Sequence, residues 1–180
     1  MKTDRKYPVF SPRADEIECM LAFHFGYRTN VIVPNISWGM CLSECDLLVL
    51  TPAGYFYEVE IKVSRSDLVA DFKKRHRHNR GARRFYFCVP EKMADCQELI
   101  AAQYPRAGLL LACGRWSATD NRWWKSIKVQ KPAGINTGAH KYSEYDRQRV
   151  LHLGCMRIWT LKAHLQKARA AKINQQEVHK

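Results

Sequence analysis

The sequence predicts an α/β domain in which helices cover a mixed sheet, followed by a basic helical C-terminal extension. Three observations lead to this class. The pattern of apolar residues and turn residues gives the order helix, three strands, helix, strand, helix and strand. The strands at 84–90 and 107–113 are apolar throughout, as is typical of central strands that are covered on both faces. The helix between them has the place of a crossover connection, which joins parallel strands.

The first elements are a helix and three strands. Residues 11–28 are predicted to form the helix, because Ser11 could cap it, Pro12 suits a first turn and Gly26 could end it. The segments that follow are rich in β-branched and aromatic residues, which favour strands. These predicted strands are 30–37, 46–51 and 55–63.

The second half of the chain continues the alternation. Ser64 and Asp67 fit a capping box, so a helix is expected from there to about residues 79–81. Besides the two apolar strands, the predicted elements are a helix at 95–104, a strand at 123–130 and basic helices at 142–153 and 157–172. The chain therefore divides into a domain over residues 1–133 and a loop with a basic helical extension over 134–180.

Length and composition predict a soluble protein of the cytoplasm. The 180 residues are enough for one ordinary domain with a core. No apolar run approaches the roughly 20 residues of a membrane span, and the N-terminus lacks the apolar centre of a signal peptide. Seven cysteines without a CxxC pair suit reduced thiols better than a disulfide framework. We expect no membrane partner.

The positive charge is concentrated in two segments. The chain has a formal net charge of +13, and residues 62–84 and 141–180 carry +7 and +6 of it. The first of these segments begins at a charged strand, so a polyanion attracted to it would lie across that strand. Nucleic acid is the expected polyanion, with DNA as the first choice and RNA possible. The alternative is a basic surface without a function.

That charged strand, YFYEVEIKV, has one apolar face and one charged face. Strand side chains alternate, so Glu58, Glu60 and Lys62 share a face opposite the apolar residues. Charged residues are rarely buried unless they are paired or bind a metal. The face is therefore either solvated surface or a built site.

A tight turn before this strand predicts which residues face each other. The Pro52-Ala53-Gly54 stretch suits a three-residue hairpin loop, with Thr51 pairing with Tyr55. In that register Asp46 lies opposite Glu60. Like charges directly opposite destabilise a sheet, whereas two carboxylates can share a hard divalent cation, Mg²⁺ or Mn²⁺. A slip of one residue would turn Asp46 to the other face.

Such a cation site suits the hydrolysis of phosphodiester bonds. The metal would polarise the phosphoryl oxygen and lower the pKa of a bound water, while Lys62 would hold or deprotonate that water. Glu16 or Glu18 of the first helix could add a carboxylate, and so could Glu58. The residues expected to contact nucleic-acid phosphates are Arg65, Lys73, Lys74 and Arg77. The tryptophans at 116, 123 and 124 could stack unpaired bases or pack at the sheet edge.

Asp46, followed fourteen residues later by Glu60-Ile61-Lys62 on the next strand, resembles the motif of the PD-(D/E)XK nuclease superfamily. Cys45 stands where the nominal motif has proline. More narrowly, DLLVLTPAGYFYEVEIKVSRSDLVADFKK, RRFYFCVPEKM and AGLLLAC resemble the MmcB-like DNA-repair endonucleases. The resemblance spans roughly residues 13–115 and leaves the C-terminal part without a counterpart.

The resemblance implies a restriction-endonuclease-like αβββαβ core and Mg²⁺-dependent hydrolysis of DNA. The catalytic positions it implies are Asp46, Glu60, Lys62 and Glu16. The implied metal positions are Asp46, Glu60, Glu16 and Ile61.

Three functions are consistent with these features. The first is a metal-dependent DNA endonuclease acting in DNA repair or in phage or mobile-element DNA metabolism. The second is a DNA-binding module on the same fold that does not cleave. The third is an adaptor whose C-terminal helices recruit a repair enzyme; these helices could also join two copies of the chain.

Overall fold

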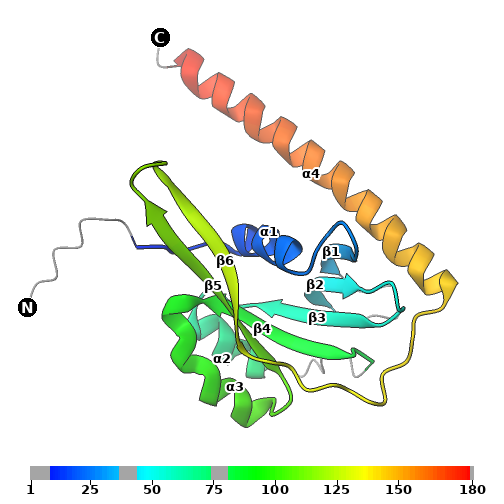
Figure 1. Ribbon diagram of the computed structural model, residues 1–180. Coiled ribbons are helices and arrows are strands. Elements are labelled where there is room, and N and C mark those ends of the chain that lie inside the picture. The colour runs from blue at the N-terminus through cyan, green and yellow to red at the C-terminus, as the bar shows by residue number, and fades with distance from the viewer. Residues whose placement is uncertain (1–8, 37–43, 74–80, 179–180) are drawn as a thin grey trace, which may run out of the picture.

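The computed structural model describes residues 9–36, 44–73 and 81–178, with side chains as far as residue 171. Its elements are α1 (Ala14–His24), β1 (Val31–Ile36), β2 (Cys45–Leu50), β3 (Phe56–Ile61), α2 (Arg65–Lys73), β4 (Arg84–Pro90), the 3₁₀ helix η1 (Glu91–Cys96), α3 (Gln97–Gln103), β5 (Gly108–Ser117), β6 (Arg122–Lys131) and α4 (Glu144–Val178). The predicted α/β class and the predicted order of elements up to β6 are confirmed (Figure 1).

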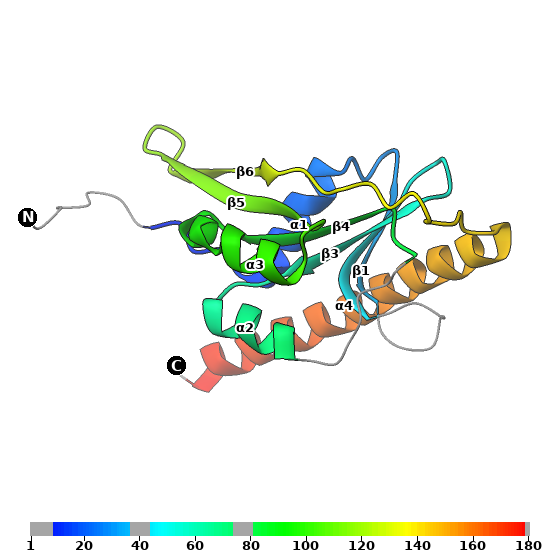
Figure 2. The same cartoon turned by 90° about the horizontal axis from the view of Figure 1, so that it is seen from below.

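The strands form one mixed sheet in the order β1-β2-β3-β4-β5-β6. The β3–β4 and β4–β5 pairs are parallel, and the three other pairs are antiparallel. The two parallel connections contain α2 and α3, as expected for crossovers. Figure 2 shows α2 and α4 below the strands.

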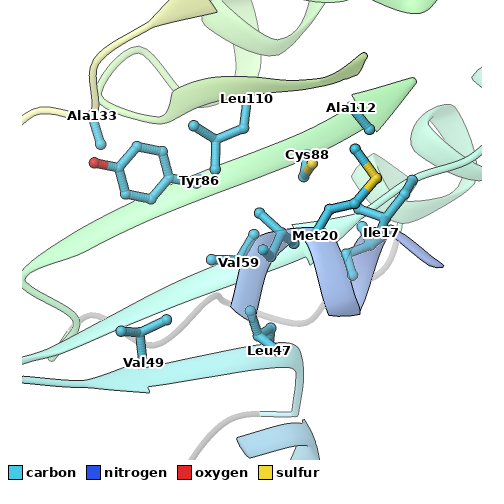
Figure 3. Packing of buried hydrophobic residues seen from close by; sticks show 12 residues of the cluster. Ile17, Met20, Leu47, Val49, Val59, Tyr86, Cys88, Leu110, Ala112 and Ala133 are labelled. Carbon is cyan, nitrogen blue, oxygen red and sulfur yellow. The ribbon is translucent and has the colours of Figure 1, made fainter. Parts of the chain in front are cut away.

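Two apolar layers cover the two faces of the sheet. On one face, Ile17 and Met20 of α1 pack on Val59 and on neighbouring strand residues (Figure 3). On the other face, Leu68 of α2 and Ile100 of α3 pack on strand residues that include Phe87. Because β4 and the start of β5 are covered on both faces, their sequences are apolar without alternation.

The hairpin between β2 and β3 has the predicted geometry. Thr51 N donates to Tyr55 O at 2.8 Å, and Gly54 has a φ of +85°, as its place in the three-residue turn requires. Leu47 pairs with Val59 in the predicted register. The same register places Asp46 opposite Glu60 at the end of the hairpin.

The predicted start of the first helix differs from the structure. The first helix begins at Ala14 with Arg13 as the N-cap residue, because Glu16 accepts a hydrogen bond from Arg13 N in a capping box. The helix therefore starts after the predicted Ser11 cap. Asp67 N donates to Ser64 Oγ at the start of α2 as predicted, and the described part of α2 extends to Lys73. Its predicted end lies partly outside the described residues.

The strand predicted over 107–113 is four residues longer at its C-terminal end. β5 continues to Ser117 because it pairs with β6 along its whole length, as far as Ser117 opposite Arg122. The run of apolar residues stops at Cys113, so the sequence pattern did not predict the last four residues of the strand. The extra residues and their partners form a two-stranded hairpin arm.

The C-terminal region is one continuous helix and not the two that were predicted. Gly154 does not interrupt α4, and it lies close to β1: a Cβ there would make an ordinary contact with Val33 at 3.4 Å. Val150 is 1% exposed, and the Tyr142 ring lies 4.6 Å from that of Phe56. In Figure 1 the C-terminal half of α4 extends away from the sheet. Within the described ranges, no helix is long and apolar enough to span a membrane.

This packing predicts where the chain can be shortened. A chain ending at Ile158 removes only the exposed part of α4, so its melting temperature should stay within about 2 °C of the full chain. A chain ending at Lys141 loses the buried contacts of Tyr142 and Val150. This loss should lower the melting temperature by about 5 °C or more. Thermal unfolding followed by circular dichroism measures both. Equal melting of the two truncated chains would contradict this packing.

Candidate functional site

The charged face of β3 is buried. Glu58 is 1% exposed, Glu60 6% and Lys62 5%. This burial excludes the solvated charged surface as an explanation of the YFYEVEIKV pattern. The charges must instead be compensated within the protein, since an isolated buried charge costs a large free energy.

The compensation is an ion cluster around the ammonium group of Lys62. Its Nζ lies 2.7 Å from Glu60 Oε2, 3.4 Å from Asp71 Oδ1 and 3.6 Å from Asp46 Oδ2. The carboxylates come from β3, α2 and β2 respectively. We call Asp46, Glu60, Lys62 and Asp71 the lysine cluster. The predicted meeting of Asp46, Glu60 and Lys62 on one side of the sheet is therefore present.

Asp46 is the solvent-facing member of the lysine cluster. Its side chain is 37% exposed, whereas those of Glu60, Lys62 and Asp71 are 6–7% exposed. The Asp46 carboxylate is held by Ile61 N, which donates to Oδ2 at 2.7 Å. The Ile61 side chain packs in the core beneath α1, so this residue borders the cluster through its backbone. A molecule from solvent would reach the cluster at Asp46.

The carboxylates around Lys62 favour its charged form over the neutral base. Burial alone lowers the pKa of the ammonium group, but the charge and hydrogen bond of Glu60, and then Asp46 and Asp71, raise it above its usual value. The side chain is therefore protonated throughout the neutral range. Of the two predicted roles, a protonated ammonium can hold a water molecule but cannot take a proton from it.

Of the two α1 acids that the sequence offered, Glu18 and not the Glu16 implied by the resemblance is the one near Asp46. Glu16 lies at β6, where its Oε1 accepts from Lys125 Nζ at 2.7 Å. That hydrogen bond, followed by the one from Arg13 N, lowers the Glu16 pKa. Glu18 lies near Asp46: burial raises the Glu18 pKa, and the negative charge of Asp46 raises it further. Residues two apart on a helix point in different directions, so only one of these two acids can face the cluster.

Asn35 supports this arrangement and was not predicted. It lies opposite Asp46 between the paired residues of β1 and β2, with a φ of +53°, a left-handed conformation that asparagine tolerates. Its Nδ2 donates to Glu18 Oε1 at 3.2 Å, and its carbonyl oxygen accepts from the Arg157 guanidinium of α4. Asn35 thus links β1, α1 and α4 next to the lysine cluster.

Asp71 was also missed, although the sequence contained a signal. Asp67 and Asp71 are four apart and share one side of α2. Because α2 follows β3 directly, a residue one turn inside it can reach back to the end of the strand.

The expected phosphate-contacting residues have different surroundings. Arg65 is exposed, and its Nη1 lies 2.6 Å from Asp95 Oδ2. Lys73 is exposed at the end of α2. Lys74 and Arg77 lie outside the described residues. Of the four expected phosphate contacts, the structure therefore describes two, Arg65 and Lys73.

The oxygen donors fit a hard divalent cation. Mg²⁺ takes one or two carboxylates and completes its octahedron with water and phosphate oxygens, so Asp46 and Glu60 would be sufficient. Three carboxylates surround one ammonium, which gives the cluster a formal negative charge that favours a cation. Among the described residues, however, no three Asp, Glu, His or Cys side chains are grouped closely enough to hold a metal by themselves.

The comparisons with known proteins show the fold alone. No family model and no curated protein match the chain. A solved structure, the SPO1766 protein of unknown function from Silicibacter pomeroyi, is similar with a TM-score of 0.57 and 18% sequence identity. The match covers 89% of this chain and 96% of that one. The overall fold of this chain therefore has a counterpart in a solved structure.

Lys62→Met is expected to destabilise the protein by about 3 to 5 kcal/mol, because it leaves buried carboxylates without their cation. The control is Lys125→Met, which removes an ammonium at the same 2.7 Å distance from a glutamate, but in a pair whose side chains are 37% and 33% exposed. That change should cost about 1 kcal/mol or less. Urea unfolding measures both free energies. Equal losses in the free energy of unfolding would show that burial does not strengthen the contribution of the lysine cluster to stability.

Proposed function

We propose that this protein is a metal-dependent endonuclease that hydrolyses phosphodiester bonds in DNA. The observation that carries the proposal is the lysine cluster: a buried ammonium and carboxylates from two adjacent strands and a helix, open to solvent at Asp46. A purely structural ion pair would not need this excess of negative charge. A site for a cation and a phosphate would use both the carboxylates and the ammonium.

The order of elements supports a restriction-endonuclease-like core. The elements α1, β1, β2, β3, α2 and β4 follow in the αβββαβ order implied by the PD-(D/E)XK resemblance. Asp46 and the Glu60-Ile61-Lys62 tripeptide lie on adjacent strands, as that motif requires. The basic segment of residues 62–84 begins at the cluster and would attract a polyanion to it.

The residues would divide the work as follows. Asp46 and Glu60 would hold a Mg²⁺ or Mn²⁺ ion, with Glu18 close enough to Asp46 to add to the negative field. When bound, the ion would polarise the phosphoryl oxygen and lower the pKa of a water molecule. Lys62 would stabilise the negative charge that develops on the phosphate. Asp71, on α2, would hold the Lys62 ammonium group in position.

A second function is favoured by one observation. The described residues contain no ready-made group of three metal-binding side chains, and Lys62 is already within 3.6 Å of three carboxylates. A DNA-binding module on the same fold that does not cleave DNA would have the same features. Cleavage and binding must therefore be measured separately.

Asp46→Asn should abolish cleavage without unfolding the protein, because this carboxylate is the exposed member of the cluster. We expect the full-length protein to cut plasmid DNA in Mg²⁺ or Mn²⁺, and the variant to be slower by at least about 100-fold. Asp15→Asn is the matched control, since Asp15 is an exposed acid of α1 that pairs with Arg13.

DNA binding by the same variants, measured without metal, separates the two functions. The nuclease proposal predicts that Asp46→Asn still binds DNA. If the unmodified protein binds DNA but cuts neither duplex, flap nor single-stranded substrates with either ion, the binding module is the correct function.

A further inference from the structure

The β5–β6 hairpin arm projects from the end of the sheet that carries the lysine cluster. Ile61, the last residue of β3, pairs with Cys88, which in turn pairs with Leu110 of β5. β5 continues from Leu110 to Ser117, and seven residues at about 3.3 Å each extend it by about 23 Å. The arm therefore reaches well beyond the cluster on the same side of the molecule (Figure 1).

One face of this arm continues the face that bears the cluster. Glu60 pairs with Phe87, and Phe87 pairs with Leu109, so these three side chains share a face. Alternation along β5 then places Arg115 on that face, and Arg115 is opposite Trp124 of β6. Trp124 and the cluster thus lie on the same side of the sheet, and α2, η1 and α3 cover the strand residues between them.

Two of the three tryptophans in the arm have a structural role. Trp116 and Trp123 are cross-strand partners whose ring centroids are 5.5 Å apart, and Phe10 packs on Trp123 at 5.1 Å. Because they lie on the opposite face from Trp124, their packing does not involve it. This aromatic packing gives the arm a rigid base.

Trp124 is exposed and yet held in place. Its side chain is 52% exposed, while its Nε1 donates to Asp120 Oδ2 at 3.0 Å. Asp120 is fixed in turn by Ser117, whose Oγ accepts from Asp120 N and donates to its carboxylate. The Arg122 guanidinium lies 4.5 Å from the indole centroid. A large aromatic surface that is both accessible and fixed in orientation is ready to stack on a planar group.

The charge of the arm indicates what that planar group belongs to. Residues 115–131 comprise most of the arm and the rest of β6. They contain five basic side chains and one acid, Asp120, which already contacts Trp124 and Arg122. Arg115, Arg122 and Lys128 are exposed, and alternation places them on the same face as Trp124. Exposed aromatic rings combined with cations are the pattern by which proteins bind single-stranded nucleic acid.

We propose that Trp124 stacks on an unpaired base of a nucleic-acid strand whose phosphates contact Arg115, Arg122 and Lys128. The strand would run along the face of the arm toward Asp46. This inference rests on the proposed function and adds the form of its substrate: DNA that is single-stranded or locally unpaired next to the cleavage point. Base pairs in an intact duplex do not expose a face to a side chain in this position.

The test is a binding measurement with the full-length protein in EDTA. Fluorescence anisotropy with a labelled oligothymidylate of about 20 nucleotides should show that Trp124→Ala binds about 10-fold more weakly than the unmodified protein. Trp124→Phe, which keeps an aromatic face, should lose no more than about 3-fold. The control is Trp159→Ala on α4, because Trp159 is also exposed (67%) with a lysine, Lys162, 4.9 Å from its ring. It should bind like the unmodified protein.

Several results would overturn the stacking role. These are unchanged affinity in Trp124→Ala, an equal loss in Trp159→Ala, an equal loss for a fully paired duplex, or no binding of the oligothymidylate at all. Since no metal is present, none of them depends on cleavage. If the protein binds the oligothymidylate through Trp124 but cleaves no DNA, the nuclease function is contradicted and the stacking site is still supported.

Discussion

The burial of one ammonium group among three carboxylates is the constraint on which the rest of the structure depends. Lys62 is paired with Glu60, and carboxylates from β2 and α2 also lie close to its ammonium group. These contacts connect β2, the end of β3 and α2 to one another. They also leave an excess of negative charge at the solvent-facing edge, where Asp46 lies. In the proposed function, this excess of negative charge would attract a cation.

The geometry of this cluster was predictable from the sequence where it depends on local rules. The Pro52-Ala53-Gly54 turn fixes the pairing of β2 with β3, and strand alternation then brings Asp46 and Glu60 to one side. Charged residues in an otherwise apolar strand indicated a built site, and their burial agrees. These inferences needed only neighbouring residues and the fixed geometry of a hairpin.

Other features depend on how elements pack together, which one sequence does not specify. The rotation of α1 about its axis decides that Glu18 and not Glu16 faces Asp46. Helix α4 continues through Gly154, which lies close to Val33 of β1, where the sequence pattern suggested a break between two helices. In both cases a local pattern allowed two answers.

The most direct test of the cation site is a crystal structure of the protein soaked in Mn²⁺, with anomalous scattering to locate the ion. The proposed nuclease site predicts an anomalous peak between the Asp46 and Glu60 carboxylates, with the Lys62 ammonium beside it. A structure in which that position stays empty at saturating Mn²⁺, while Lys62 keeps its contacts with all three carboxylates, would contradict the claim that the cluster is built for a metal.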